Sequence, residues 1–255
     1  KNKSAIPKII AALELAPGDT IIEIGPGEGA LTFPLLEAAE KIGAKVIAIE
    51  KDPHLANQLK SYASATVDEL EIATGDALKL LNSLTHKLNN WKLVGNIPYY
   101  ITGHLLRIIS ELENKPALSV LMVQEEVADR ICAKPPKMNL LAAITQFWAT
   151  PELILRLKPK DFDPPPKVNS AVIKLGGRVQ GLGFREKKTE YFKVVKALFK
   201  QPRKTAANNL SVGLKISKKE AVDLVKSAGL PENARPQNFS LDQLIKLSTG
   251  SPIFP

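Results

Sequence analysis

The 255-residue sequence has one cysteine, Cys132, and three histidines. A single cysteine excludes any disulfide within the chain and any metal site built from several cysteines. The histidines, His54, His86 and His104, are scattered without the short spacing of metal ligands. We therefore expect no bound metal, and a reducing cytoplasmic compartment is the simplest setting for such cysteine usage.

Long apolar runs are also missing. No uninterrupted apolar segment of the sequence approaches the length of about 20 residues that spans a membrane. The printed chain does not open with the charged and then apolar segments of an export leader. We expect a cytoplasmic monomer with no membrane partner.

Charge is unevenly distributed along the chain. The sequence has 35 Lys and Arg against 26 Asp and Glu, a formal net charge of +9. Residues 1–175 hold 20 of each sign, which leaves 15 basic and 6 acidic residues in 176–255. Clustered Lys and Arg attract the phosphates of a polyanion. The pattern favours a small-molecule pocket in the first part and a nucleic-acid-binding surface in the second, with a merely solubilising surface as the alternative.

Strand and helix patterns alternate over the first 176 residues. Short apolar strands are predicted at 20–24, 45–49, 70–73, 91–95 and 118–123. Helices are predicted at 3–13, 29–40, 52–63, 103–112 and 124–132. Two later strands, at 144–149 and 170–175, would close the sheet as an antiparallel hairpin. Such alternation predicts an α/β fold whose parallel sheet has helices on both faces.

The composition changes at Gly176-Gly177, where a Gly- and Lys-rich linker (176–188) begins. Beyond it the patterns are helical, at 189–200, 203–212, 217–227 and 240–248. We therefore predict an α/β domain over 1–176 and a small, basic, all-helical domain over 177–255.

The first predicted strand runs into a glycine-rich turn. Gly25, Gly27 and Gly29 follow Ile24 at alternate positions, and a helix pattern begins directly after them. Glycines let the backbone turn tightly and approach a ligand, and the N-terminus of the next helix presents free N–H groups. The turn therefore predicts a nucleotide-like ligand, unless it only turns a corner.

Acidic residues follow the next two predicted strands. Glu50 ends the second strand, 21 residues after Gly29, where a dinucleotide-type site places an acid on ribose hydroxyls. Asp76 follows the third strand within Gly75-Asp76-Ala77. Parallel strands end at one edge of the sheet, so these acids are expected to converge on the same pocket as the glycine turn.

The fourth predicted strand ends in Asn96-Ile97-Pro98-Tyr99. The exocyclic amine of a base such as adenine is a poor nucleophile, because its lone pair is delocalised into the ring. The Asn96 side-chain oxygen and the Ile97 carbonyl would accept its two N–H bonds and free the lone pair for an electrophilic methyl group. Pro98 fixes the turn and the Tyr99 ring is placed to stack on the base. The alternative is an ordinary Asn-Pro loop with a half-buried tyrosine.

Two further segments are candidates for contact with a nucleic acid. Phe162 opens a proline-rich loop that contains Lys167, and its ring would pack on the opposite face of a flipped base. In the basic part, Pro202 suits a helix start, which would place Arg203 and Lys204 in a first helical turn, with Lys200 just before it. A phosphate there would relieve the conflict between these cations and the helix dipole.

Together these segments resemble the ribosomal RNA adenine-N6,N6-dimethyltransferases, and specifically the small-subunit, kasugamycin-resistance type. The resemblance covers nearly the whole chain, and its pieces are residues 23–32, Glu50, 75–77, 96–99 and 164–170. It implies a Rossmann-like class I methyltransferase sheet with a small helical domain, and S-adenosylmethionine as cofactor. It also implies dimethylation of two adjacent adenines near the 3′ end of small-subunit ribosomal RNA, as part of ribosome maturation.

The resemblance assigns roles residue by residue. The implied cofactor-binding residues are Gly25, Gly27, Glu50, Lys51, Asp76, Ala77 and Asn96, with the glycines against the methionine part, Glu50 on the ribose and Asp76 on the adenine. The implied catalytic residues are Asn96, Ile97, Pro98, Tyr99 and Phe162, with the two rings on either side of the target adenine. The RNA-binding candidates are Lys167, Lys200, Arg203 and Lys204.

The sequence departs from the family pattern in two places. Members usually begin with a basic segment and a Gly-Gln-Asn-Phe-Leu-like motif that helps to close the cofactor site, and this motif would precede Lys1. Without it we expect weaker binding of cofactor or RNA. The helical domain of the family commonly has paired arginines before Lys-Thr, whereas Pro202 replaces the first of them here.

Three other functions fit parts of the sequence. The related large-subunit, macrolide-resistance enzyme shares the catalytic half, although 199–210 and 234–240 look more like the small-subunit enzyme. A non-catalytic nucleic-acid-binding factor on the same scaffold is disfavoured by the intact motif at Asn96. An NAD-dependent oxidoreductase is disfavoured by the glycine spacing and by the absence of a plausible acid for hydride transfer.

Overall fold

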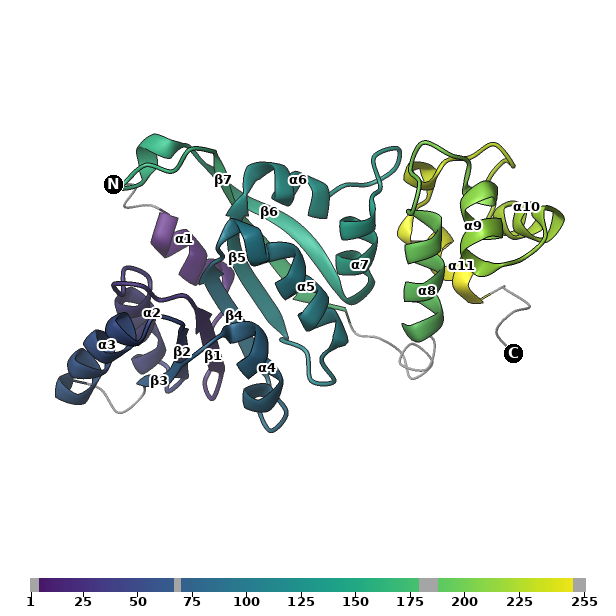
Figure 1. The fold of residues 1–255 in the computed structure, drawn as a ribbon. Coiled ribbons are helices and arrows are strands. Elements are labelled where there is room, and N and C mark those ends of the chain that lie inside the picture. Colours follow the sequence, from purple (N-terminus) through teal and green to yellow (C-terminus); the bar gives the residue numbers. More distant parts are fainter. Residues whose placement is uncertain (1–4, 67–69, 179–187, 250–255) are drawn as a thin grey trace. The chain divides into compact units, whose positions relative to one another are not determined.

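The computed structural model describes residues 5–66, 70–178 and 188–249 (Figure 1). The chain forms two compact units. The first comprises the residues up to Ala128 together with Thr150–Gly177, and the second comprises Asp129–Ala149 and the residues from Arg178 onward. No helix in the described ranges is both long enough and apolar enough to span a membrane.

A seven-stranded sheet forms the centre of the first unit. Its strands are β1 (Thr20–Ile24), β2 (Lys45–Glu50), β3 (Leu70–Thr74), β4 (Trp91–Asn96), β5 (Leu118–Gln124), β6 (Ala149–Leu157) and β7 (Ser170–Gly177). The order across the sheet is β3-β2-β1-β4-β5-β7-β6. The first five strands pair in parallel and β7 runs antiparallel to β5, so the predicted α/β fold is confirmed.

The strand order creates a crevice between β1 and β4. From β1 the chain moves outward through β2 to β3, and it then returns to the other side of β1 to form β4. The connections leave β1 and β4 in opposite directions, and ligands of open α/β sheets bind at the carboxyl ends of strands at such a reversal. The fold therefore places a binding site beyond Ile24 and Asn96, the last residues of these two strands.

Helices connect the strands of the first unit. They are α2 (Thr32–Glu40), α3 (Pro53–Thr66), α4 (Ala77–Thr85) and α5 (Thr102–Glu111); α1 (Ala5–Ala12) precedes β1, and α6 (Glu125–Ile131) begins in this unit and ends in the second. The short 3-10 helices η1 (Tyr99–Ile101) and η2 (Pro159–Asp161) follow β4 and β6. Helix α4 had not been predicted, although Asp76 marks its start by capping it: Oδ1 accepts a hydrogen bond from the Leu78 N–H at 3.0 Å.

One face of the sheet packs against α1 and α2. Ile9 of α1 and Leu35 of α2 share a buried core with Ile21, Val94 and Val120, which come from three neighbouring strands. Successive side chains of a strand point to opposite faces. Glu23 and Asn96 are two residues beyond Ile21 and Val94, so they lie on this same face at the carboxyl edge of the sheet.

The predicted strand at 144–149 is wrong. Residues Leu140–Trp148 form helix α7, and the strand β6 starts only at Ala149. Asn139 caps the helix through a hydrogen bond from the Ala142 N–H to Oδ1 at 3.1 Å. The segment is apolar on nearly every side. The pattern of a short apolar run does not by itself distinguish a buried helix from a buried strand.

The second unit is helical. It contains α7, α8 (Lys188–Leu198), α9 (Ala206–Leu214), α10 (Lys218–Ser227) and α11 (Leu241–Thr249). Its division from the first unit at Gly177–Arg178 is one residue from the predicted boundary, but Asp129–Ala149 joins it as well. The reason is packing, because Phe147 of α7 stacks on Tyr191 of α8 with ring centroids 4.1 Å apart. Most of the predicted linker, at 179–187, lies outside the described residues.

The predicted start of the helix near Pro202 is also wrong. Helix α9 begins at Ala206, and Thr205 is its cap, with Oγ1 accepting from the Asn208 N–H at 3.3 Å. Residues 201–204 form a turn before the helix. Arg203 and Lys204 are therefore exposed in this turn instead of opposing the dipole within the first helical turn.

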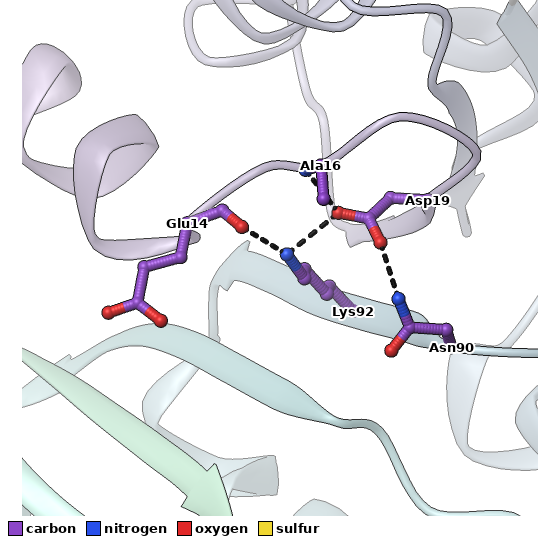
Figure 2. Close-up of polar contacts among 5 residues, drawn as sticks. All are labelled: Glu14, Ala16, Asp19, Asn90 and Lys92. Carbon is purple, nitrogen blue, oxygen red and sulfur yellow. Dashed lines mark hydrogen bonds and ion pairs between the residues drawn. The ribbon is translucent and has the colours of Figure 1, made fainter.

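A buried polar cluster ties the turn after α1 to the start of β4 (Figure 2). Lys92 Nζ lies 2.7 Å from Asp19 Oδ2 and also donates to the Glu14 backbone oxygen. Asn90 Nδ2 donates to Asp19 Oδ1 at 2.8 Å, and the Ala16 N–H donates to Oδ2 at 2.7 Å. This cluster holds the amino-terminal edge of the sheet, opposite the edge that carries the binding crevice.

Candidate active site

A pocket of about 400 Å³ opens at the carboxyl ends of β1 and β4. Its lining includes Glu23, Gly25, Gly27, Leu31, Gly95, Asn96, Met122 and Phe162. The pocket thus lies at the reversal of the strand order, as expected for a ligand site in an open α/β sheet. It brings together the glycine turn, Asn96 and Phe162, which the sequence places far apart.

The glycine turn brings the backbones of β1 and β4 close together. Gly25 has a φ of +69°, in the left-handed region that side chains rarely adopt. A β-carbon on Gly95, the neighbour of Ile24 in β4, would lie 2.5 Å from the Ile24 backbone oxygen. Only glycine fits there, so the floor of the pocket is made of closely spaced backbone.

Glu50 holds the glycine turn from the neighbouring strand. Its side chain is buried at the end of β2, where Oε2 accepts a hydrogen bond from the Gly27 N–H at 3.1 Å. Oε1 accepts from the Asp52 N–H at 2.9 Å. Glu50 therefore lies at the strand end where the sequence placed it, but it does not line the pocket as the structure stands.

Asp76 lies at the end of the third strand, next to Lys51. Its Oδ2 is 3.7 Å from Lys51 Nζ, while Oδ1 caps helix α4. Ala77 is buried as the first residue of that helix. Lys51, Asp76 and Ala77 line the carboxyl edge of β2 and β3, outside the pocket lining. Their predicted contacts with a cofactor stay predictions.

The segment from Asn96 to Tyr99 leaves β4 in a fixed conformation. Asn96 is exposed to the pocket, whereas Ile97 is fully buried and its N–H donates to the Met122 backbone oxygen at 3.0 Å. Tyr99 is half-buried, and its hydroxyl group lies 3.1 Å from Ser170 Oγ of β7. The exposed Pro98 lies between them. The motif is thus anchored by β5 and β7, which lie on the side of β4 away from β1 and its glycine turn.

Phe162 reaches the pocket from the loop between β6 and β7. It follows η2, where its N–H donates to the Pro159 oxygen at 3.1 Å, and its side chain packs partly against the core below. The proline-rich loop ends at Asn169, whose Nδ2 donates to Glu125 Oε2 at 2.7 Å. Lys167 is exposed on this loop. Phe162 therefore belongs to the pocket wall, and its predicted stacking on a flipped base stays a prediction.

Glu23 was not predicted as a site residue. It is 2% exposed, it lines the pocket, and Oε2 has no hydrogen-bond partner among the described residues. Burial raises the pKa of this carboxyl from its usual 4.5 to about 7, the nearby Thr32 hydroxyl opposes the rise, and the charge of Glu50 adds to it. The one signal in the sequence was an acid inside the apolar strand Thr20–Ile24.

The basic candidates of the second unit surround a smaller hollow of about 270 Å³. Lys200, Lys204 and Lys218 line it, together with Asn208 and Asn209 at the start of α9. Arg203 is exposed in the same turn but is not part of the lining. The cations are therefore gathered by residues 200–204 and by the start of α10, which the sequence alone did not connect.

The sequence matches a known family over almost its whole length. The family described as ribosomal RNA adenine dimethylase matches residues 1–249. A ribosomal RNA small subunit methyltransferase A from Dehalococcoides mccartyi is 36% identical over 250 residues, which are 96% of this chain and 83% of the relative. The protein of the same name from Desulfitobacterium hafniense is 38% identical over 240 residues, covering 93% of this chain and 84% of the relative.

Solved structures share the fold. A dimethyladenosine transferase from Plasmodium falciparum superposes with a TM-score of 0.80 at 25% identity, over 97% of this chain and 94% of that one. The 23S rRNA methyltransferase ErmE has a TM-score of 0.76 at 24% identity over 98% and 97% of the two chains, a likeness that shows the fold alone. The match over residues 1–249 and the relatives above 30% identity show that this chain belongs to the ribosomal RNA adenine dimethylase family of methyltransferases.

Proposed function

We propose that this chain transfers methyl groups from S-adenosylmethionine to the N6 atoms of two adjacent adenines near the 3′ end of small-subunit ribosomal RNA. The observation that carries the proposal is the position of Asn96, which lines the pocket beside the glycine turn at the reversal of the strand order. A donor held by the turn and a base held by Asn96 would meet there.

The pocket residues fit the cofactor that this family implies. The turn at Gly25 and Gly27 offers close backbone approach, and a β-carbon on Gly27 would meet open space within 4 Å. The buried Glu23 carboxyl, whose Oε2 has no hydrogen-bond partner in the described part of the chain, suits a ligand with positive charge. Glu50 and Asp76 would take the ribose hydroxyls and the adenine from the next two strand ends. When bound, S-adenosylmethionine supplies a methyl group already activated by its positively charged sulfur.

The protein would orient the target amine. The Asn96 side-chain oxygen and the Ile97 backbone oxygen would accept hydrogen bonds from the N6 amine, which turns its lone pair toward the methyl group. The hydrogen bond from the Ile97 N–H to Met122 fixes that peptide. No strong base is required, because positioning and electrostatics lower the barrier. Tyr99, anchored at Ser170, and Phe162 would stack on the two faces of the base.

Two observations support small-subunit RNA as the substrate. The relatives at 36% and 38% identity are named small-subunit methyltransferases. The exposed cations Lys167, Lys200, Arg203 and Lys204 would contact phosphates, and the last three lie on the unit that carries the excess of positive charge. Lys167 lies on the first unit, in the loop that Phe162 opens, and would meet RNA close to the target base.

The test is transfer of labelled methyl groups to small ribosomal subunits that lack dimethyladenosine. Large subunits and protein-free RNA serve as parallel substrates, and digestion to nucleosides identifies the product. We expect dimethyladenosine in the small-subunit RNA alone. Label in the large-subunit RNA alone would contradict the proposed substrate, and cofactor binding with no transfer to any RNA would contradict catalysis.

A further inference from the structure

Tyr100 is the most exposed large apolar or aromatic side chain among the described residues, at 82%. It lies in η1, between β4 and α5 (Figure 1), directly after Tyr99, which the proposed mechanism places on the target base. The two other exposed aromatic residues of the described chain, Phe33 and Tyr62, contact each other with ring centroids 5.8 Å apart. Packing within the fold therefore does not explain the Tyr100 ring. A single exposed ring is ordinary on a protein surface, so its position has to decide its role.

The backbone around Tyr100 is held on both sides. The Ile101 N–H donates to the Pro98 backbone oxygen at 3.0 Å and closes the 3-10 turn. The hydroxyl group of Tyr99 lies 3.1 Å from Ser170 Oγ. A tyrosine on a fixed backbone has only two side-chain torsions to order, so a ligand that contacts its ring loses little conformational entropy. Tyr100 is therefore a prepared contact rather than part of a loose loop.

The start of α5 leaves open space beside Tyr100. Residues three and four apart are neighbours on the surface of a helix. Gly103, three residues on, is exposed, and a β-carbon there would have no atom within 4 Å. His104, four residues on, is exposed as well. The surface beside Tyr100 thus has room for a flat group as large as a base.

The substrate of the proposed reaction is a polymer, so it continues beyond the base in the pocket. A base that enters an active-site pocket leaves its stack, and the base next to it loses a stacking partner. Consecutive Cα atoms are about 3.8 Å apart, so Tyr100 directly adjoins the residue whose ring would hold the target base. An exposed aromatic ring at that position offers the neighbouring base the partner that it has lost.

We propose that Tyr100 forms a stacking subsite, outside the pocket, for the nucleotide next to the target adenine. This inference rests on the proposed function and deepens it, because it names a contact for the second of two adjacent bases. Every base has a flat face that an aromatic ring can stack on, so the subsite fixes position and not sequence. Tyr100 is absent from the pocket lining and touches no reacting atom. For one of the two target adenines, the base on Tyr100 is the other adenine of the pair.

The experiment is transfer of labelled methyl groups to small ribosomal subunits that lack dimethyladenosine, with variants of Tyr100. Stacking needs a flat ring and no hydroxyl group, so we expect Tyr100→Phe and Tyr100→Trp to keep kcat/KM within about twofold of the wild type. For Tyr100→Ala we expect kcat/KM to fall about fivefold or more, through a higher KM for the subunits at a nearly unchanged kcat. Unchanged kcat/KM in Tyr100→Ala, or an equal loss in Tyr100→Phe, would overturn the inference.

Tyr62→Ala is the matched control. Tyr62 is 55% exposed on α3 and has no part in the proposed RNA contacts, so we expect its replacement to leave kcat/KM unchanged. Thermal unfolding is measured for every variant. Because the Tyr100 ring is largely in solvent, we expect Tyr100→Ala to unfold within about 2 °C of the wild type. A loss of transfer together with a large fall in unfolding temperature would show a structural role and overturn the inference.

Subunits reconstituted from RNA that lacks one base of the adenine pair test the partner of Tyr100 directly. One form lacks the first base and the other lacks the second, and the remaining adenine is the sole acceptor of the pair. Whichever neighbour stacks on Tyr100, one form has lost that base and the other has kept it. We therefore expect Tyr100→Ala to lower kcat/KM about fivefold on one form and less than about twofold on the other. Equal losses on both forms would overturn the assignment to the neighbouring base.

The proposed function and this inference fail separately. If the wild type transfers no methyl group to intact subunits, the proposed function is overturned, and this inference with it. If the wild type transfers methyl groups and Tyr100→Ala does so equally well, only the stacking subsite is overturned.

Discussion

Lys92 and Asp19 form an ion pair inside the protein, with Nζ 2.7 Å from Oδ2 and side chains that are 8% and 0% exposed. The pair joins the start of β4 to the turn between α1 and β1 (Figure 2). Every oxygen of the Asp19 carboxylate has a donor, since Asn90 and the Ala16 N–H complete the set. Such a pair is held in place by its hydrogen bonds, and it fixes β1 and β4 at the edge opposite the pocket.

Replacement of Lys92 by methionine is expected to destabilise the protein by about 3–5 kcal/mol, because it leaves the Asp19 carboxylate buried without its cation. Urea unfolding measures the change. The control is Lys41→Met, since Lys41 and Glu37 are both about 70% exposed and water screens an exposed pair, so we expect little change in stability. A similar loss of unfolding free energy in Lys92→Met and Lys41→Met would show that the buried pair stabilises the protein no more than the exposed one.

The free energy of unfolding is expected to depend on pH through Glu23. The pKa of this group is raised in the folded state, from 4.5 to about 7, so the folded protein binds more protons than the unfolded chain between these values. Stability contributed by Glu23 is therefore lost as the pH rises from about 4.5 to about 7. The full loss is about 3 kcal/mol at about 1.4 kcal/mol per pKa unit.

Glu23→Gln removes this dependence. We expect the ligand-free variant to gain stability relative to the wild type between pH 5 and pH 8, measured by urea unfolding at both values. The exposed Glu28→Gln variant is expected to differ from the wild type by the same amount at each pH. A constant difference between Glu23→Gln and the wild type would contradict a raised pKa. Glu23 in the cofactor pocket is therefore expected to lower the free energy of unfolding of the ligand-free protein near neutral pH.

Asn96→Ala is expected to lower the rate of methyl transfer at least about a hundredfold, because the amine loses an acceptor that orients its lone pair. RNA affinity is expected to stay within about twofold, since Asn96 lies in the pocket and not among the exposed cations. Transfer of labelled methyl groups and a filter-binding assay measure the two quantities. Asn82→Ala, at an exposed site on α4, is the control. Near-normal transfer by Asn96→Ala would remove Asn96 from the mechanism.

The double variant Arg203→Ala/Lys204→Ala is expected to bind RNA more weakly and with a shallower dependence on salt. Each phosphate contact that is lost lowers the slope of log affinity against log salt by about one. The control is Lys41→Ala/Lys45→Ala, which removes the same charge at the amino-terminal edge of the sheet, far along β2 from Glu50. An unchanged slope for Arg203→Ala/Lys204→Ala would place the RNA surface elsewhere.

Local sequence patterns were enough to predict most of the helices and strands. The predicted strands at 20–24 and 45–49 are observed as Thr20–Ile24 and Lys45–Glu50, because each is a short apolar segment bounded by a turn. Helix α7 was mistaken for a strand because its apolar residues face protein on most sides. The start of α9 was placed too early because Pro202 suits a helix start, whereas Thr205 supplies the cap that the backbone uses.

The sequence by itself determined the chemistry available to the protein: a glycine turn after an apolar strand, acids at two further strand ends, and Asn96 with a proline and a tyrosine behind it. These features depend on residues close together in the chain. Only the tertiary structure showed that Glu50 and Asp76 lie outside the lining of the pocket that the turn and Asn96 share, because the shape of a pocket depends on contacts between distant segments. It also decided that Glu23 is buried and that its Oε2 lacks a hydrogen-bond partner among the described residues, since burial of one side chain depends on everything that packs around it.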